Sequence, residues 1–309
     1  MNVLVTGATG FIGQAVVAEL VKGGHHVKAM HRRQEQKYIF MARNNLETVM
    51  ADVNDPASMV VAVQDVDVVI HLAGVVWGDA IQMRSCMIDG TINLIEAIRQ
   101  SKVKRLVLAS SIAVYDWGKL NGILSEKSPL LDKSDTRQGP YALAKIQQES
   151  LALDLCRSYG IDLIVLRLGA VFTSGRLETA DLGPNLTAIQ VVIAPLRKLR
   201  LVALNEVAHS FIVACTVRVF NSLTINIVDE IQPTAWSFAR KTRPVNILIP
   251  LPYMMIKFIA FPIYWLARIF GLESKLPKLF SPQRIKNRFK SCRYDSTVRQ
   301  KFLSSIDRV

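Results

Sequence analysis

Acidic residues and cysteines are both scarce in this sequence, and each scarcity narrows what the protein can be. There are 25 aspartates and glutamates against 38 lysines and arginines, which leaves a formal charge of +13. This balance suits an anionic partner: cofactor phosphate, an anionic membrane surface or nucleic acid. The few cysteines lie far apart and form no C-x-x-C pair, so we expect reduced, mostly buried thiols, no disulfide and no metal. They are Cys86, Cys156, Cys215 and Cys292.

Two further features are missing, a nucleic-acid-binding module and a leader segment. The chain has no zinc-finger spacing, no aromatic ribonucleoprotein motif and no separate basic arm, so we expect no nucleic-acid partner. An apolar strand starts at residue 2, which leaves no room for a signal peptide and predicts a cytoplasmic protein. Half of the residues are hydrophobic and a fifth are charged, as in a globular protein with a full core.

The first thirteen residues, MNVLVTGATGFIG, predict a phosphate-binding turn. A short apolar strand runs into Gly7, Gly10 and Gly13, and a helical pattern follows. Gly7 permits a tight turn, Gly10 lets a phosphate approach the backbone, and Gly13 lets the helix pack closely on the strand. The positive end of that helix favours an anion, most simply a dinucleotide pyrophosphate.

Strands and helices alternate over the first two thirds of the chain, and the alternation predicts an α/β fold with a doubly wound parallel sheet. Right-handed crossovers place the ends of the parallel strands at one edge. That edge is expected to carry Gly7, Arg32, Asp52, Ala73, Ser111 and Leu168. The expected helices include 85–99 and 206–222, and the expected strands include 26–30, 46–51, 66–72, 103–109, 162–168 and 224–228.

The second strand ends in His31-Arg32-Arg33, at the position where such folds choose between cofactors. An acidic residue there binds the ribose 2′-hydroxyl of NAD, whereas arginine accommodates the 2′-phosphate of NADP. Arg32 and Arg33 therefore favour NADP(H), with NAD(H) as the other choice. The alternative is a solvated basic turn without a ligand.

Tyr141-Ala142-Leu143-Ala144-Lys145 is the sharpest chemical motif. Tyrosine and lysine at positions i and i+4 share one helix face, and the ammonium is expected to lower the phenol's pKa towards neutrality. A pair of serines, Ser110-Ser111, ends a strand between this motif and the glycine turn. His71 is expected to be a satisfied residue of the sheet and not a catalytic base.

Seven motifs in order resemble the extended short-chain dehydrogenase/reductase superfamily, in its NAD-dependent epimerase/dehydratase group. They are TGATGFIG at 6–13, ADV at 51–53, VDVVIHLAG at 66–74, GTINLIEA at 90–97, SSIAVYD at 110–116, PYALAK at 140–145 and LRLGAVF at 166–172. The resemblance implies a Rossmann sheet with a smaller, discontinuous C-terminal substrate domain. It also implies that the protein could form a homodimer, because relatives commonly pair through the helix that carries the tyrosine.

The resemblance assigns a role to each matching residue. Tyr141 would be the general acid/base, Lys145 would bind the nicotinamide ribose and tune Tyr141, and Ser111 would hydrogen-bond the substrate oxygen. The remaining cofactor-binding residues would be Gly7, Thr9, Gly10, Phe11, Ile12 and Gly13 at the pyrophosphate, Arg32 and Arg33 at the 2′-phosphate, Asp52 and Val53 at the adenine, and Leu72, Ala73 and Gly74 beside the cofactor.

We expect two domains. Residues 1–172, with 204–228 returning to the same sheet, would form the NAD(P)-binding domain, and residues 173–203 and 229–309 the substrate domain. Segment 244–272 is apolar but broken by prolines and two cations, so it does not read as a spanning helix. It is either a lid over the substrate or a helix on a membrane surface, with peripheral contact through 244–293.

The second half departs from nucleotide-sugar enzymes at several positions. Met87 stands where the family often has asparagine, Thr173-Ser174-Gly175 where it usually has Gly-Pro-Gly, and residues 203–206 read ALNE. We therefore expect an NAD(P)-dependent oxidoreductase that moves hydride between the nicotinamide and a hydroxyl/ketone carbon of an apolar, sterol- or lipid-like substrate. Two alternatives stay open: a nucleotide-sugar epimerase/dehydratase with retained cofactor, and a cofactor-stabilised, non-catalytic scaffold.

Overall fold

The computed structural model describes residues 1–40, 44–76, 78–134, 139–173, 182–183, 185–186, 188–217, 222–242, 247–272, 285, 289 and 292–305. Its centre is a seven-stranded sheet in which all neighbours are parallel, in the order β12-β7-β5-β4-β1-β2-β3. This confirms the doubly wound α/β prediction. The strands are β1 (Asn2–Thr6), β2 (His26–His31), β3 (Leu46–Met50), β4 (Val68–His71), β5 (Arg105–Ser111), β7 (Asp162–Leu168) and β12 (Ser222–Ile227).

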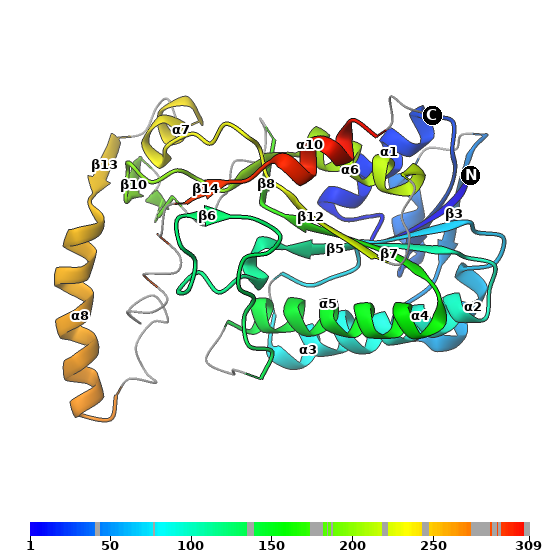
Figure 1. Ribbon diagram of the computed structural model, residues 1–309, viewed down its shortest axis with the longest axis horizontal. Coiled ribbons are helices and arrows are strands. Elements are labelled where there is room, and N and C mark those ends of the chain that lie inside the picture. The colour runs from blue at the N-terminus through cyan, green and yellow to red at the C-terminus, as the bar shows by residue number, and fades with distance from the viewer. Residues whose placement is uncertain are drawn as a thin grey trace.

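Helices cover both faces of the central sheet (Figure 1). On one face lie α1 (Phe11–Lys22), α6 (Leu204–Thr216) and α10 (Thr297–Leu303), and on the other α2 (Pro56–Ala62), α4 (Gly90–Arg99) and α5 (Pro140–Tyr159). Successive residues of β1 enter different cores: Val3 and Val5 pack towards α1, and Leu4 packs towards α4. This alternation follows the two-residue period of a strand. Strands apolar on both faces are therefore buried completely, as a parallel sheet requires.

Two predicted helices have different limits in the structure. The expected helix 85–99 is a longer run made of α3 (Ala80–Arg84), a π-helical turn (Ser85–Asp89) and α4. The expected helix 206–222 ends at Thr216, where Val217 has the extended backbone of a cap residue (φ −60°, ψ 140°). Threonine and valine are β-branched and favour extended backbone over helix, which accounts for the earlier end.

A second, smaller core lies beside the central sheet. It contains the parallel pair β8 (Ala170–Phe172) with β11 (Leu201–Ala203), and a sheet of β13 (Ile247–Leu251), β10 (Ile189–Ile193) and β9 (Asn185–Leu186). Helix α7 (Ala235–Thr242) buries Ala235 and Phe238 against Val192 and Leu199. The division into two domains stays a prediction. One part of it needs correction, because Phe302 of α10 packs in the core of the central sheet and not with the expected substrate domain.

Helix α8 (Tyr253–Ile269) follows β13 and projects from one end of the molecule (Figure 1). It runs as one helix through Pro262. Among the described residues, no helix is both long and apolar enough to cross a membrane. Residues 284–293 include five lysines and arginines and end the stretch expected to contact a membrane, and most of them lie outside the described residues, as do 244–246 of the apolar segment. The short strand β14 (Arg293–Tyr294) pairs with β6 (Ile123–Leu124), and α10 follows β14 in the chain.

Candidate functional site

The glycine turn after β1 has the predicted form. Gly7 adopts a left-handed backbone (φ +66°), and a Cβ there would lie 2.7 Å from the Ala73 nitrogen. A Cβ on Gly13 would lie 2.2 Å from the Gly7 oxygen, so both positions require glycine. Gly10 is the N-cap of α1, and a Cβ there would meet only the Gly7 oxygen, at 3.2 Å. Its outward side is therefore open to a phosphate at the positive end of α1, and the turn fits a dinucleotide.

The other expected cofactor residues lie at the carboxyl ends of neighbouring strands. Arg32 and Arg33 follow β2 and are exposed, and both their backbone nitrogens donate to Gln36 Oε1 (3.2 and 3.1 Å). Asp52 is half-buried after β3, and its carboxylate accepts from the Asn54 nitrogen at 3.0 Å. Val53 is buried. Leu72, Ala73 and Gly74 directly follow β4.

Tyr141 stands in the first turn of α5 and Ser111 at the end of β5, and the structure brings them together. Their side chains are hydrogen-bonded to each other. Burial raises the pKa of Tyr141, and the Ser111 bond acts in the opposite direction. The expected lowering of this pKa by Lys145 is therefore wrong. The phenol keeps its proton at neutral pH and can donate it to an acceptor beside Ser111.

Lys145 is buried one turn further along α5, where its Nζ donates to the Ala109 carbonyl (2.8 Å) and Gln148 Oε1 (2.9 Å). Burial lowers the pKa of Lys145 to about 8, against the opposing charge of Glu149. A Cβ built on Gly74 would lie 3.8 Å from Nζ, so the ammonium borders the backbone after β4. Lys145 thus lies at the same edge of the sheet as Tyr141, and its ammonium is oriented by the hydrogen bonds to Ala109 and Gln148.

A buried polar chain continues from Lys145 into the sheet. Gln148 Nε2 contacts Thr91 Oγ1 (2.8 Å), His71 Nε2 lies 3.1 Å from the same hydroxyl, and His71 Nδ1 lies 2.7 Å from Thr6 Oγ1. Both ring nitrogens of His71 are thereby satisfied, as expected of a residue of the sheet. Burial lowers the pKa of His71 to about 3, so the ring stays neutral.

Three residues at the site were not found from sequence. Cys86 is half-buried among Arg32, Asp52 and Lys145, and burial raises the pKa of its thiol. Met83 and Met87 form an apolar cluster with Ala144 that also packs on Val75 and Tyr141. No spacing motif marks these residues. Only Met87 could have been found from sequence, because it places a thioether where the family often has the amide of asparagine.

A buried ion pair holds α5 against the sheet. The Arg167 guanidinium on β7 pairs with the Glu149 carboxylate, which also accepts from Ser110 Oγ at 2.7 Å. Arg167 Nη1 donates to the Tyr115 hydroxyl (2.7 Å), which donates to Asn226 Oδ1 (2.8 Å). Because Ser110 precedes Ser111 and Glu149 lies one turn after Lys145, this network fixes the catalytic candidates relative to one another.

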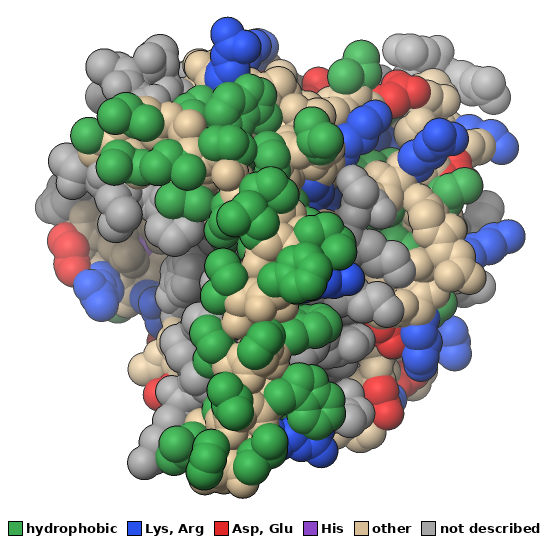
Figure 2. Space-filling view, turned by 90° about the vertical axis from the view of Figure 1, so that its left-hand side faces the viewer, with side chains coloured by type: hydrophobic (Ala, Val, Ile, Leu, Met, Phe, Trp, Pro, Cys, Tyr) green, Lys and Arg blue, Asp and Glu red, His purple; other side chains and the backbone are tan. Residues whose placement is uncertain are grey.

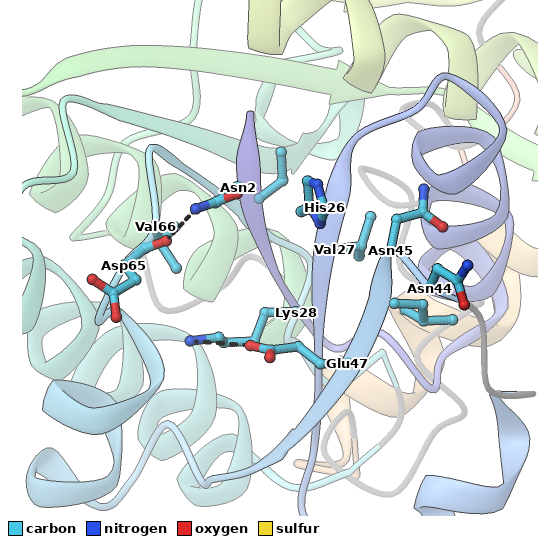
Figure 3. A pocket seen from close by; sticks show the side chains of 11 residues that line it. Asn2, His26, Val27, Lys28, Asn44, Asn45, Glu47, Asp65 and Val66 are labelled. Carbon is cyan, nitrogen blue, oxygen red and sulfur yellow. Dashed lines mark hydrogen bonds and ion pairs between the residues drawn. The ribbon is translucent and has the colours of Figure 1, made fainter.

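A cavity of about 340 Å³ opens at the opposite edge of the sheet (Figure 3). Its lining includes Asn2, His26 and Leu46, which begin β1, β2 and β3. Polar groups there pair with one another: Lys28 bridges to Glu47 at 3.2 Å, and Asn2 Nδ2 donates to the Asp65 carbonyl. Ligands of open α/β sheets bind at the carboxyl ends of the strands, so this cavity is not part of the candidate site.

This strand order, with a glycine turn and a Tyr-x-x-x-Lys helix at its carboxyl edge, defines a Rossmann-type protein of the extended short-chain dehydrogenase/reductase class. The chain belongs to the NAD dependent epimerase/dehydratase family, whose sequence model matches residues 3–190. The resemblance stated from the motifs is thus confirmed.

Similar proteins include both epimerases and reductases. An uncharacterized UDP-glucose epimerase of Bacillus subtilis (strain 168) is 29% identical over 195 residues, 56% of this chain and 57% of that protein. The 2-alkyl-3-oxoalkanoate reductase of Stenotrophomonas maltophilia (strain K279a) is 32% identical over 158 residues, 50% of this chain and 46% of that protein. The chain spans about half the length of the curated relatives it matches.

A solved structure extends the comparison to the fold. MoeE5 in complex with UDP-glucuronic acid and NAD has a TM-score of 0.67 and 23% identity, covering 81% of this chain and 85% of that chain. At this identity the likeness shows the shared fold. NAD is bound in that structural neighbour.

Proposed function

We propose that the protein is an NAD(P)-dependent oxidoreductase acting on a hydroxyl/ketone carbon of an apolar substrate. The observation that carries the proposal is the Ser111–Tyr141 hydrogen bond beside the Met83, Met87 and Val75 side chains. A proton donor and a hydrogen-bond donor there would face one oxygen, and the described side chains packed beside Tyr141, those of Val75, Met83 and Met87, are apolar. The similar 2-alkyl-3-oxoalkanoate reductase, named for an alkyl-bearing oxo compound, supports this substrate class.

The chain's own residues divide the work in the direction of reduction. Ser111 hydrogen-bonds the carbonyl oxygen, and the protonated Tyr141 donates its proton to that oxygen as the carbonyl becomes an alcohol. Lys145, held by Ala109 and Gln148, would bind the nicotinamide ribose. Hydride donation and acceptance at carbon is the chemistry that the nicotinamide supplies when bound. Gly7, Gly10 and Gly13 would hold its pyrophosphate, and Arg32 and Arg33 support NADP(H) over NAD(H).

A nucleotide-sugar epimerase that retains its cofactor is the second candidate. It is favoured by the similarity to the Bacillus subtilis protein named as a UDP-glucose epimerase. The two candidates differ in cofactor exchange: an oxidoreductase releases its cofactor after each turnover, whereas an epimerase regenerates it in place. A non-catalytic scaffold, the third candidate, is opposed by the intact arrangement of Ser111, Tyr141 and Lys145.

Substrate panels distinguish these candidates. The purified chain is incubated with NADPH or NADH and with two sets of compounds, alkyl or steroid ketones and UDP-sugars. We expect NADPH oxidation with at least one apolar ketone, no interconversion of UDP-sugars, and little nucleotide released when the purified protein is denatured. UDP-sugar interconversion with stoichiometric released cofactor would establish the epimerase instead. Inactivity on both sets, with intact cofactor binding, would favour the scaffold.

A further inference from the structure

Helix α8 has its apolar face turned outward, the reverse of an ordinary surface helix. Its single fully buried residue is Ala260, which packs on Ile193, Ile285 and Phe289. The opposite side exposes large apolar side chains, among them Phe258 (73% exposed) and Ile269 (74%). A surface helix of a globular protein normally points such residues into the core. This apolar face therefore needs a partner other than the protein's own interior.

The exposed residues form one continuous face. At 3.6 residues per turn they fall within one half of the helix circumference. They are Met254, Met255, Phe258, Ile259, Ile263, Trp265, Leu266 and Ile269. Figure 2 shows these hydrophobic side chains as a column along α8, with further hydrophobic side chains above it. The patch extends to β13, which directly precedes α8 and exposes Ile247 and Ile249.

In the described segment that carries this face, the charges are all of one sign. Segment 247–272 contains no acidic residue, and its two charged residues are Lys257 and Arg268. By the same helical geometry both border the apolar face on one side. Each cation lies over an aromatic ring, Lys257 Nζ 4.8 Å from the Tyr253 centroid and the Arg268 guanidinium 5.3 Å from that of Trp265. Long cationic side chains can keep their stems in an apolar layer while their heads reach an anionic surface.

We propose that α8 is a lipid-binding helix that lies in the plane of an anionic bilayer surface, with its exposed half in the acyl boundary and Lys257 and Arg268 at the headgroups. An apolar face, a cationic border and interfacial Tyr and Trp are the features of such helices. A second copy of the chain fits less well, because it would bring cations of the same sign towards each other. The chain's charge of +13 adds attraction to an anionic surface.

Vesicle flotation of the full chain tests this proposal. Vesicles of neutral phosphatidylcholine are compared with vesicles that also contain an anionic phospholipid. We expect binding to both, stronger on the anionic ones. Phe258→Ser with Ile269→Ser should weaken binding to both vesicle types by at least about tenfold, because two large apolar side chains no longer enter the acyl boundary. Lys257→Gln with Arg268→Gln should weaken anionic binding about 30-fold and neutral binding far less.

Matched controls come from α2 at the other end of the molecule (Figure 1) and from an exposed loop. Val61→Ser removes an apolar side chain that is 57% exposed, and Lys119→Gln removes an exposed charge, so both should leave flotation unchanged. The cofactor affinity of every variant is also measured. An unchanged affinity shows that the variant is folded and that the proposed function is intact, whatever its lipid binding.

Two results would overturn the proposal. One is a wild-type chain that floats with neither vesicle type. The other is a dimer in sedimentation velocity that Phe258→Ser with Ile269→Ser dissociates, while vesicle binding stays unaffected. In that case the apolar face would belong to a second copy.

Discussion

At the residue scale, burial sets the protonation states of the candidate site. Tyr141 and Lys145 are four residues apart on α5, yet the Lys145 ammonium is held by Ala109 and Gln148. Burial raises the pKa of Tyr141 and lowers that of Lys145 to about 8. At neutral pH the phenol carries its proton and the amine is mostly charged. This pair of states suits proton donation to a carbonyl oxygen.

The buried His71 gives a testable pH dependence of stability. Its pKa is about 3 in the folded chain and about 6.5 when exposed on unfolding. A lowered folded pKa contributes stability that is present above pH 6.5 and lost as the pH falls towards 3. This one ring should therefore remove about 1.4 kcal/mol of unfolding free energy per pH unit below 6.5.

Urea unfolding of wild type, His71→Gln and His26→Gln at several pH values measures this effect. His26 is exposed and serves as the matched control. From pH 6.5 to about 4.5, the stability of wild type relative to His71→Gln should fall by about 2 kcal/mol. The His26→Gln variant controls for replacing an exposed histidine. A constant difference between wild type and His71→Gln would show that the ring is not buried neutral.

At the element scale, β2 ends directly before Arg32 and Arg33, which we propose choose the cofactor. It ends at His31, whose Nδ1 lies 2.9 Å from the Arg33 carbonyl, and Gln36 fixes the two arginine nitrogens. The turn therefore holds Arg32 and Arg33 at the carboxyl edge of the sheet. A 2′-phosphate there would gain charge-assisted hydrogen bonds that a 2′-hydroxyl cannot match.

Cofactor titrations by calorimetry test this role of the turn. Arg32→Ala with Arg33→Ala should weaken NADP(H) binding by about tenfold to a hundredfold and NAD(H) binding by less than about threefold. Lys119→Ala removes an exposed charge elsewhere and should affect neither. Equal losses for both cofactors in the double variant would make the turn a general electrostatic attraction, with no 2′-phosphate site.

Local patterns predicted the elements and the edge of the site, and long-range contacts explain what was missed. The Gly13–Gly7 contact and the i, i+4 spacing of Tyr141 and Lys145 lie within a few residues, so sequence was sufficient to place these residues but not to set the Tyr141 pKa. The Gln148–Thr91 contact joins residues 57 positions apart, and no spacing rule reveals it. Phe302 likewise reaches the core of the central sheet only through tertiary packing. The apolar pattern of α8 would be the same whether that face pointed to solvent or into a core, so the sequence does not tell which way it points.

At the scale of the whole molecule, the catalytic candidates lie on β5 and α5, and the exposed apolar face lies on α8. The carboxyl edge of the central sheet carries the glycine turn and Ser111, and Tyr141 lies in the first turn of α5. Helix α8 projects from the end that carries the smaller sheet (Figure 1). The Glu149–Arg167 ion pair joins α5 to β7 of the central sheet. The fold brings Ser111, Tyr141 and Lys145 to one edge of the central sheet, and the proposed function assigns proton donation to Tyr141.

The most direct test is the reduction rate of Tyr141→Phe with NADPH and the best ketone of the panel. Tyr159→Phe is the matched control, because Tyr159 lies at the other end of α5 and its hydroxyl donates to Glu96. We predict that kcat of Tyr141→Phe falls by about 10²- to 10⁴-fold while cofactor affinity changes less than about twofold, and that Tyr159→Phe keeps its activity. An unchanged kcat in Tyr141→Phe would show that Tyr141 is not the proton donor.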